Sequence, residues 1–387
     1  MMDYDKLISK KCFEMKPSGI RRFFDMANAR EGVISLGVGE PDFQTPWNVR
    51  QAAISSLERG KTKYTANSGM AELKTAIADK IQKDLGVTYD PSQVIVTVGG
   101  SEGIDIAIRS IVDPGDEVLV VEPCFVCYSP IVSLSGGVPV PLETKAENDF
   151  KLTADLLREK ITDRTKMLIL PFPNNPTGAV MDRKDLEEIA AVLEGTDILV
   201  LSDEIYSALT YGGEHTSIIQ IGDMAERTIL VNGFSKAYSM TGWRLGYVAA
   251  PAPLIKQMLK IHQYAIMCSP TVSQYAAVEA ITACDKDVEK MRTEYDQRRR
   301  WLVKALNGIG LDCFEPRGAF YVFPSIKRTG LSSEEFCERL LNEYDVAVVP
   351  GNAFGDSGEG FIRISYAYSL KHIMTAVERI NDFITHI

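Results

Sequence analysis

A lysine and an arginine stand eight positions apart in the segment VNGFSKAYSMTGWRLGY, which spans residues 231–247. Small and hydroxyl residues surround Lys236 and Arg244, and the apolar run RTILV (227–231) just before them predicts a buried strand. A lysine at the partly buried end of a strand can lose its proton and form a Schiff base. An arginine at the start of the next apolar run needs an anion, and a phosphate suits its forked donors. Taken alone, each residue could equally belong to a solvated loop.

The turn VGGSEGI (98–104) has the composition of an anion site. Two glycines and Ser101 stand where an apolar run changes into a helical pattern, so free backbone N–H groups and the helix dipole favour a negative ligand there. The alternative is a tight turn in which Ser101 caps the helix. The glycine spacing does not match the dinucleotide-binding pattern, which argues against a nicotinamide dehydrogenase.

Two further apolar runs end in polar residues. Asp203 closes the run DILVLSDE, and a carboxylate in that setting needs a cation or a protonated ring nitrogen as its partner. Tyr206, one helical turn further on, can direct its hydroxyl to the same place. The sharp turn PNNPTG (173–178) fixes the side chain of Asn175, although it could also be a turn with no other role.

Alternating apolar runs and helical stretches predict an α/β fold with a mostly parallel sheet. Ligands in such sheets bind beyond the carboxyl ends of the strands, and the polar residues above all come directly after strand ends. We therefore expect Ser101, Asn175 (with its neighbour Asn174), Asp203 and Lys236 at one rim. The apolar runs are 94–100, 116–121, 166–173, 197–204 and 227–234.

The pattern changes after residue 285. A long charged helix (286–308) is followed by short strands, LDCFEP (311–316) among them, then an amphipathic helix, more strands and a final helix. This order predicts a smaller α+β domain. We expect a large domain over 45–285 and a small domain formed by 1–44 together with 286–387.

The net charge, the apolar runs and the cysteine and histidine content argue against several classes of protein. The 387 residues carry a net charge of −10, which disfavours a nucleic acid or an anionic membrane as partner. No apolar run is long enough to cross a bilayer, and the N-terminus has no apolar secretory core. The seven cysteines and four histidines form no metal template, and the pair Cys124 and Cys127 is expected to be two ordinary thiols. These features predict a cytoplasmic protein with reduced cysteines and without a metal.

A phosphate cradle, a carboxylate, an asparagine, a tyrosine, a lysine and an arginine together meet the needs of pyridoxal 5′-phosphate. The motifs that hold them, with FIRISYA near the C-terminus, resemble the class I aminotransferases of fold type I in order and spacing. The resemblance extends from about residue 18 to the C-terminus, and is nearest to bacterial enzymes of the aspartate, aromatic and acetyl-diaminopimelate kind. It implies a large domain with a mostly parallel seven-stranded sheet. The motifs are NNPTG (174–178), SDEIY (202–206), SKAYSMTGWRLGY (235–247) and FIRISYA (361–367).

The resemblance assigns roles to residues at matching positions. Lys236 would hold the cofactor covalently and move the substrate proton, and Asp203 would pair with the ring nitrogen. Asn175 and Tyr206 would bond the phenolic oxygen of the ring. The phosphate would be held by Gly100, Ser101, Glu102, Ser235 and Arg244, with Ser101 and Glu102 contributing through their backbone N–H groups.

Further positions concern the ring face, the substrate and a second subunit. Phe125 would stack on the ring, with Tyr128 as the alternative, unless both rings simply pack in the core. Arg363 would bind the substrate α-carboxylate, near Gly39 and Asn175, unless it forms a strand-edge ion pair. Tyr64 would reach the cofactor phosphate of a partner subunit, which implies a homodimer with shared active sites.

Departures from the family leave the substrate open. Gly233 stands where some relatives have a serine, and no second arginine is assigned to a distal carboxylate, although Arg21 or Arg22 could serve. The segment 262–274 is more apolar than usual through Tyr264 and its neighbours. Aromatic amino acids, aspartate and N-acyl diamino acids all stay possible.

The leading hypothesis is transfer of an amino group from an L-amino acid to a 2-oxo acid, with 2-oxoglutarate as acceptor, by a ping-pong mechanism. A carbon–sulfur β-lyase would use the same residues. A non-catalytic sensor module of the same fold is disfavoured, because the chain shows no helix-turn-helix extension and retains both the lysine and the arginine.

Overall fold

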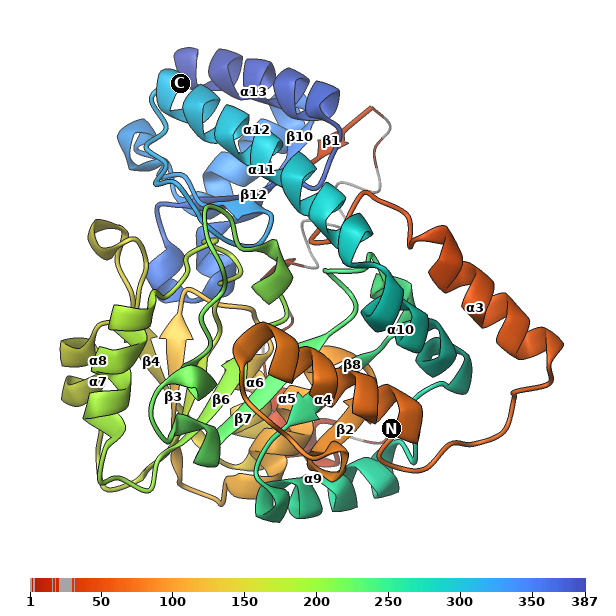
Figure 1. The fold of residues 1–387 in the computed structure, drawn as a ribbon. Coiled ribbons are helices and arrows are strands. Elements are labelled where there is room, and N and C mark those ends of the chain that lie inside the picture. The colour runs from red at the N-terminus through yellow and green to blue at the C-terminus, as the bar shows by residue number, and fades with distance from the viewer. Residues whose placement is uncertain (1, 3, 16, 18, 21–29, 31) are drawn as a thin grey trace.

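The computed structural model describes residues 2, 4–15, 17, 19–20, 30 and 32–387. Its centre is a seven-stranded sheet, with helices on both faces (Figure 1). In spatial order the strands are β2 (Val94–Thr97), β8 (Gly246–Ala249), β7 (Thr228–Gly233), β6 (Leu199–Asp203), β5 (Thr165–Leu170), β3 (Glu117–Glu122) and β4 (Val138–Glu143). Only β8 runs antiparallel to its neighbours, so the predicted mostly parallel sheet is confirmed.

The edge strand β4 was missed from the sequence. Its residues VPVPLE contain two prolines and are mostly half-buried or exposed. Proline cannot donate to a ladder and is confined to sheet edges, and its presence hides the apolar pattern of an interior strand.

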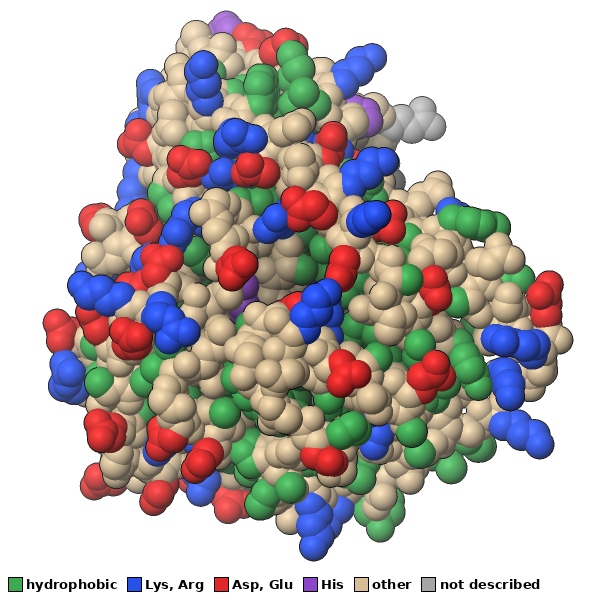
Figure 2. Space-filling model, viewed as in Figure 1, with side chains coloured by type: hydrophobic (Ala, Val, Ile, Leu, Met, Phe, Trp, Pro, Cys, Tyr) green, Lys and Arg blue, Asp and Glu red, His purple; other side chains and the backbone are tan. Residues whose placement is uncertain are grey.

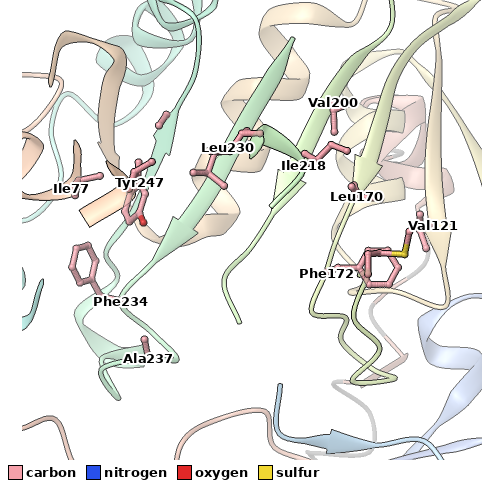
Figure 3. Close-up of a cluster of buried hydrophobic side chains, with 14 of the residues drawn as sticks. Ile77, Val121, Leu170, Phe172, Val200, Ile218, Leu230, Phe234, Ala237 and Tyr247 are labelled. Carbon is pink, nitrogen blue, oxygen red and sulfur yellow. The ribbon is translucent and has the colours of Figure 1, made fainter. Parts of the chain in front are cut away.

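Alternate residues of each strand enter two separate cores, because side chains in a strand point to opposite faces. On one face, side chains such as Val121, Leu170, Val200 and Leu230 point to the same side (Figure 3). On the other face, the intervening residues pack on further helices. The helices on the first face are α3 (Trp47–Glu58), α4 (Ala71–Leu85), α7 (Ala154–Lys160), α8 (Arg183–Leu193) and α10 (Thr271–Ala283). Those on the second are α5 (Gly99–Ile111), α6 (Tyr128–Ser135) and α9 (Ala252–Ala265).

Burying one large aliphatic side chain contributes about 1.5–3 kcal/mol, so these two cores fix the positions of the strand ends. The polar residues just beyond the strands are thereby held on a rigid frame.

The C-terminal part forms a smaller α+β region, at the top of Figure 1. Its antiparallel sheet has the order β11 (Val349–Pro350), β12 (Ile362–Ser365) and β9 (Tyr321–Val322). From the N-terminal part, β1 (Ile34–Ser35) pairs in parallel with β10 (Val346–Ala347). The helices here are α11 (Asp285–Gly308), α12 (Ser333–Tyr344) and α13 (Leu370–Thr385), and a short α1 (Lys10–Glu14) lies near the N-terminus.

The predicted strand over 311–316 was wrong. This stretch is irregular, and the side chain of Asn307 bonds both backbone polar groups of Cys313 at 3.0 Å. A side chain thus satisfies groups that a neighbouring strand would otherwise need to pair.

Charged side chains of both signs are intermixed on the face drawn in Figure 2. Among the described residues, no helix has the length and apolarity needed to cross a bilayer. The same part of the chain holds no group of three His, Cys, Asp or Glu side chains suited to a metal ion.

Candidate active site

A cavity of about 620 Å³ lies beyond the carboxyl ends of β5, β6 and β7, where the C-terminal region closes over the sheet. It brings together most of the residues selected from the sequence. Those that line it are Gly39, Gly100, Ser101, Phe125, Asn175, Asp203, Tyr206, Ser235, Lys236, Arg244 and Arg363. Asn174 instead folds the turn, since its side-chain oxygen accepts from the backbone and hydroxyl of Thr177.

Lys236 lies just beyond β7 and is positioned by the fully buried Phe234 before it. Its Nζ donates to the carbonyl oxygen of Gly39 at 2.6 Å. Burial, together with the charges of Arg363 and Arg244, lowers the pKa of Lys236 to about 8 against the opposite effect of nearby carboxylates. The amine can therefore gain and lose a proton near neutral pH.

Asp203 is the last residue of β6 and is only 6% exposed. The Tyr128 hydroxyl donates to its Oδ2 at 2.7 Å, and the backbone N–H of Ile205 donates to Oδ1 at 3.2 Å. Burial raises the pKa of Asp203, and because these hydrogen bonds offset the effect only in part, the pKa is about 6. Burial makes the charged form of this carboxylate unfavourable, and a cationic partner stabilises it. A protonated ring nitrogen is such a partner.

The opposite end of the cavity suits a phosphate. Gly100 and Ser101 lie in the first turn of α5, whose N–H groups and dipole favour an anion. Arg244 stands beside them with a φ of 52°, and a Cβ on Gly99 would lie 2.8 Å from its Nη2. A side chain at position 99 would therefore displace the guanidinium, and the φ of +75° at this position also favours glycine.

The side chain of Glu102 turns away from the cavity. It accepts from the backbone N–H of Val98 and lies 2.6 Å from Nδ1 of the fully buried His262. Any contact of Glu102 with a ligand in the cavity would have to come from its backbone, as the resemblance to the family implied.

Arg363 on β12 is 3% exposed, and burial lowers its pKa. Its guanidinium lies between the rings of Tyr321 and Phe354, at 4.4 and 4.7 Å from their centroids. Nη1 donates to Asn175 Oδ1 at 2.8 Å and Nη2 donates to the carbonyl of Gly37. Nε is buried without a hydrogen-bond partner among the described residues, and no described carboxylate forms an ion pair with this arginine. An unpaired buried cation is costly, so the site favours a carboxylate ligand.

Tyr206 was selected from the sequence as a site residue, whereas Tyr321 was not. The hydroxyls of the two residues are 2.8 Å apart, and a Cβ on Gly39 would lie 2.3 Å from the Tyr321 oxygen. Tyr321 thus contacts both Tyr206 and Arg363. This role was missed because its surroundings AFYVFP resemble an ordinary apolar strand.

The hydrogen bond from Tyr128 to Asp203 was also missed, since the sequence offered Tyr128 only as a stacking ring. Phe125 lines the cavity beside it, with its ring centroid 6.1 Å from that of Tyr128.

The predicted phosphate contact Tyr64 is 78% exposed and does not line this cavity. Arg21 and Arg22 lie outside the described residues.

The cavity residues fit pyridoxal 5′-phosphate. Asp203 has no cationic hydrogen-bond partner among the described residues, the α5 start and Arg244 can bind an anion, and Lys236 lines the same cavity. The unpartnered Nε of Arg363 leaves room for a substrate carboxylate beside the same lysine.

Known proteins resemble the chain over nearly its whole length. The family model for aminotransferase class I and II matches residues 31–380. A putative aminotransferase of Bacillus subtilis, YugH, is 53% identical over 372 residues, with 96% of each chain covered. Aromatic-amino-acid aminotransferase 2 of Thermococcus litoralis is 45% identical, over 96% of this chain and 97% of its own. The structure of aspartate aminotransferase from Thermus thermophilus with maleate has a TM-score of 0.93 and 40% identity, with 97% and 99% of the two chains covered.

Proposed function

Because the chain belongs to the class I and II aminotransferases, we propose that its cavity moves the amino group of an L-amino acid to 2-oxoglutarate in two alternating half-reactions. The aminotransferase class and the cofactor, pyridoxal 5′-phosphate, agree with the resemblance of the motifs and are confirmed by the family match and the solved relatives. The proposed amino-acid substrate is supported mainly by the buried Arg363, which lines the same cavity as Lys236 and whose Nε has no hydrogen-bond partner among the described residues.

Pyridoxal 5′-phosphate, when bound, supplies an electron-accepting ring that makes the Cα proton of an amino acid acidic. In our proposal Asp203 holds the ring nitrogen, while Asn175 and Tyr206 hold the ring oxygen and Phe125 covers one ring face. Gly100, Ser101, Glu102, Ser235 and Arg244 hold the phosphate.

Lys236 attaches the cofactor and, once free, carries the proton that leaves Cα. A base with a pKa of about 8 is matched to that task, because a group titrating near the working pH both accepts and returns protons readily. The carbonyl of Gly39 stabilises the protonated amine at 2.6 Å.

Arg363 binds the α-carboxylate and fixes which bond of Cα faces Lys236. Its Nη1 already donates to Asn175, and the ring of Tyr321 covers one face of the guanidinium. The arginine is therefore held in place before the substrate binds.

We further propose a homodimer in which Tyr64 of each subunit reaches the phosphate of the other. Tyr64 does not line its own cavity, and it borders a shallow pocket together with Leu57 and residues 268–272. Further apolar side chains of α3 and of residues 264–267 are exposed, namely Trp47, Ile54, Leu57, Tyr264, Ile266 and Met267. Exposed apolar area of this kind on adjoining segments is typical of a protein interface.

The division into a large domain (45–285) and a small domain (1–44 with 286–387) is also a proposal. The pairing of β1 with β10 supports it, since it places an N-terminal strand in the C-terminal region. A cytoplasmic location is supported by the seven cysteines, all of which are free thiols.

A half-reaction screen tests the function. The cofactor-loaded enzyme is mixed with each common L-amino acid in turn, and the visible spectrum is followed as the cofactor becomes the amine form. After a donor has reacted, the amine form of the enzyme must transfer its amino group to added 2-oxoglutarate. Release of pyruvate from cystathionine, without any keto-acid product from the donors, would instead indicate a β-lyase.

A further inference from the structure

The loop over residues 36–46, between β1 and α3, supplies two backbone acceptors to the cavity. The carbonyl of Gly39 accepts from Lys236, and the carbonyl of Gly37 accepts from Arg363. The position of this one loop therefore affects both the lysine and the arginine to which the proposed function assigns the chemistry.

A buried arginine of α11 holds the middle of the loop. Arg298 is 6% exposed, and its Nη1 lies 2.9 and 2.8 Å from the two carboxylate oxygens of Asp42. Its guanidinium also lies over the ring of Phe43, 5.4 Å from the centroid. A buried charge-assisted contact of this kind is strong and directional, so Arg298 restrains two consecutive residues of the loop.

The far end of the loop is tied to the lysine segment. The Thr45 hydroxyl donates to the carbonyl of Ser239 at 2.6 Å, and Trp243 Nε1 donates to that hydroxyl at 3.0 Å. The loop is thus held on one side by α11 and on the other by the segment that carries Lys236.

We propose that Arg298 is a positioning residue, which through Asp42 fixes the carbonyls of Gly37 and Gly39 against Arg363 and Lys236. This inference rests on the proposed function of the cavity. A shift of the loop would weaken the hydrogen bond that holds Lys236 and the contact that orients Arg363, although Arg298 itself lines no part of the cavity. Small displacements of this kind lower reaction rates strongly, because the reacting groups must be closely aligned.

The variants Arg298→Lys and Asp42→Asn test this inference. Arg298→Lys keeps the charge but removes Nη1, which contacts both carboxylate oxygens of Asp42, and the contacts of Nε and Nη2 to Glu294 in the same helix. Asp42→Asn is nearly isosteric and changes a side chain that is 25% exposed, so it preserves the fold best. Arg299→Lys is the matched control. Arg299 is the next residue of α11, is 5% exposed, and contacts Asp296 and Glu315 instead of the loop.

We expect Arg298→Lys and Asp42→Asn each to lower kcat/KM for the amino-acid donor by about tenfold. The double variant should be little worse than either single one, because both remove the same contact. Arg299→Lys should leave kcat/KM near that of the wild type, whatever its melting temperature.

A second readout does not depend on turnover. The rate at which cofactor-free protein captures pyridoxal 5′-phosphate tracks the neutral form of Lys236, and its pH midpoint reports that amine. Loss of a hydrogen bond to the protonated form should lower the midpoint in Arg298→Lys and in Asp42→Asn, but not in the control.

Unchanged kcat/KM and midpoint in both variants, with only a lower melting temperature, would show that Arg298 is merely structural. If Arg298→Lys does not fold, Asp42→Asn alone decides between the two outcomes. A wild-type enzyme without aminotransferase activity would count against the proposed function, whereas active wild type with unaffected variants would count only against this inference.

Discussion

The two arginines at opposite ends of the cavity differ in burial. Arg244 is exposed, and its guanidinium donates a local hydrogen bond to the carbonyl of Thr241, at 3.2 Å. Arg363 is 3% exposed, lies between two aromatic rings and has one N–H group without a partner among the described residues. One guanidinium is solvated, and the other is not.

This difference indicates how each ligand is held. In our proposal the start of α5, Ser101 and Ser235 share the phosphate with Arg244, so no single contact dominates. The substrate carboxylate, by contrast, is proposed to depend on Arg363, whose buried charge has no acidic partner among the described residues. Several shared contacts suit a cofactor that stays bound, whereas one arginine suits a substrate that must leave after each turnover.

The lysine between the two ends should give the largest effect. We expect Lys236→Ala to lower the amino-transfer rate by about 10⁴-fold, because it removes both the attachment point and the proton carrier. Steady-state assays with the best donor of the half-reaction screen measure this loss. Retention of wild-type turnover would place the chemistry elsewhere.

The buried arginine comes next. We expect Arg363→Met to lower kcat/KM for the amino-acid donor by about 10²–10³-fold, since removal of one partner of a buried ion pair costs about 3–5 kcal/mol. Pyridoxal 5′-phosphate should still bind nearly as well, as equilibrium titration of cofactor-free protein can check. Equal losses of cofactor and substrate binding would remove the distinction between the two ends.

The exposed arginine should matter less. We expect Arg244→Met to weaken cofactor binding by about tenfold, because the helix start and hydroxyl groups still hold the phosphate. At saturating cofactor, kcat/KM for the donor should recover to near the wild-type value. A loss that saturation does not repair would mean that Arg244 also acts on the substrate.

The smallest effect concerns the pH dependence of cofactor capture. In cofactor-free wild type the capture rate should rise with pH and level off above about 8, where Lys236 is neutral. Both arginines lower the pKa of Lys236, Arg363 more than Arg244, and removing a positive neighbour favours the protonated amine. The midpoint should therefore move upward in both methionine variants, and further in Arg363→Met. Stopped-flow absorbance at a series of pH values measures the midpoints, and a downward shift would contradict this explanation.

Much of the cavity could be predicted from the sequence because its residues come directly after strand ends. A buried strand has a recognisable apolar pattern, and parallel strands bring the residues at their carboxyl ends to one rim. Asp203 and Lys236 were found in this way, whereas Arg363 required the family resemblance.

The rest depends on contacts between segments that are distant in the sequence. The hydrogen bond from Tyr128 to Asp203 and the packing of Tyr321 on Arg363 have no local pattern, since both tyrosines stand in apolar surroundings. The tether from Arg298 to Asp42 joins residues 256 positions apart and could not be read from either segment. The irregular stretch 311–316 was mistaken for a strand because the side chain that satisfies its backbone lies in the preceding helix.

Peptide mapping of the borohydride-reduced enzyme tests most directly that this cavity holds the cofactor on Lys236. The wild-type protein is loaded with pyridoxal 5′-phosphate, reduced, digested and analysed by mass spectrometry. We predict one modified site, Lys236, in the peptide that spans residues 231–247, and no modification of Lys236→Ala protein treated in the same way. A label on another lysine, or none on the loaded wild type, would contradict the assignment of the cavity as the active site.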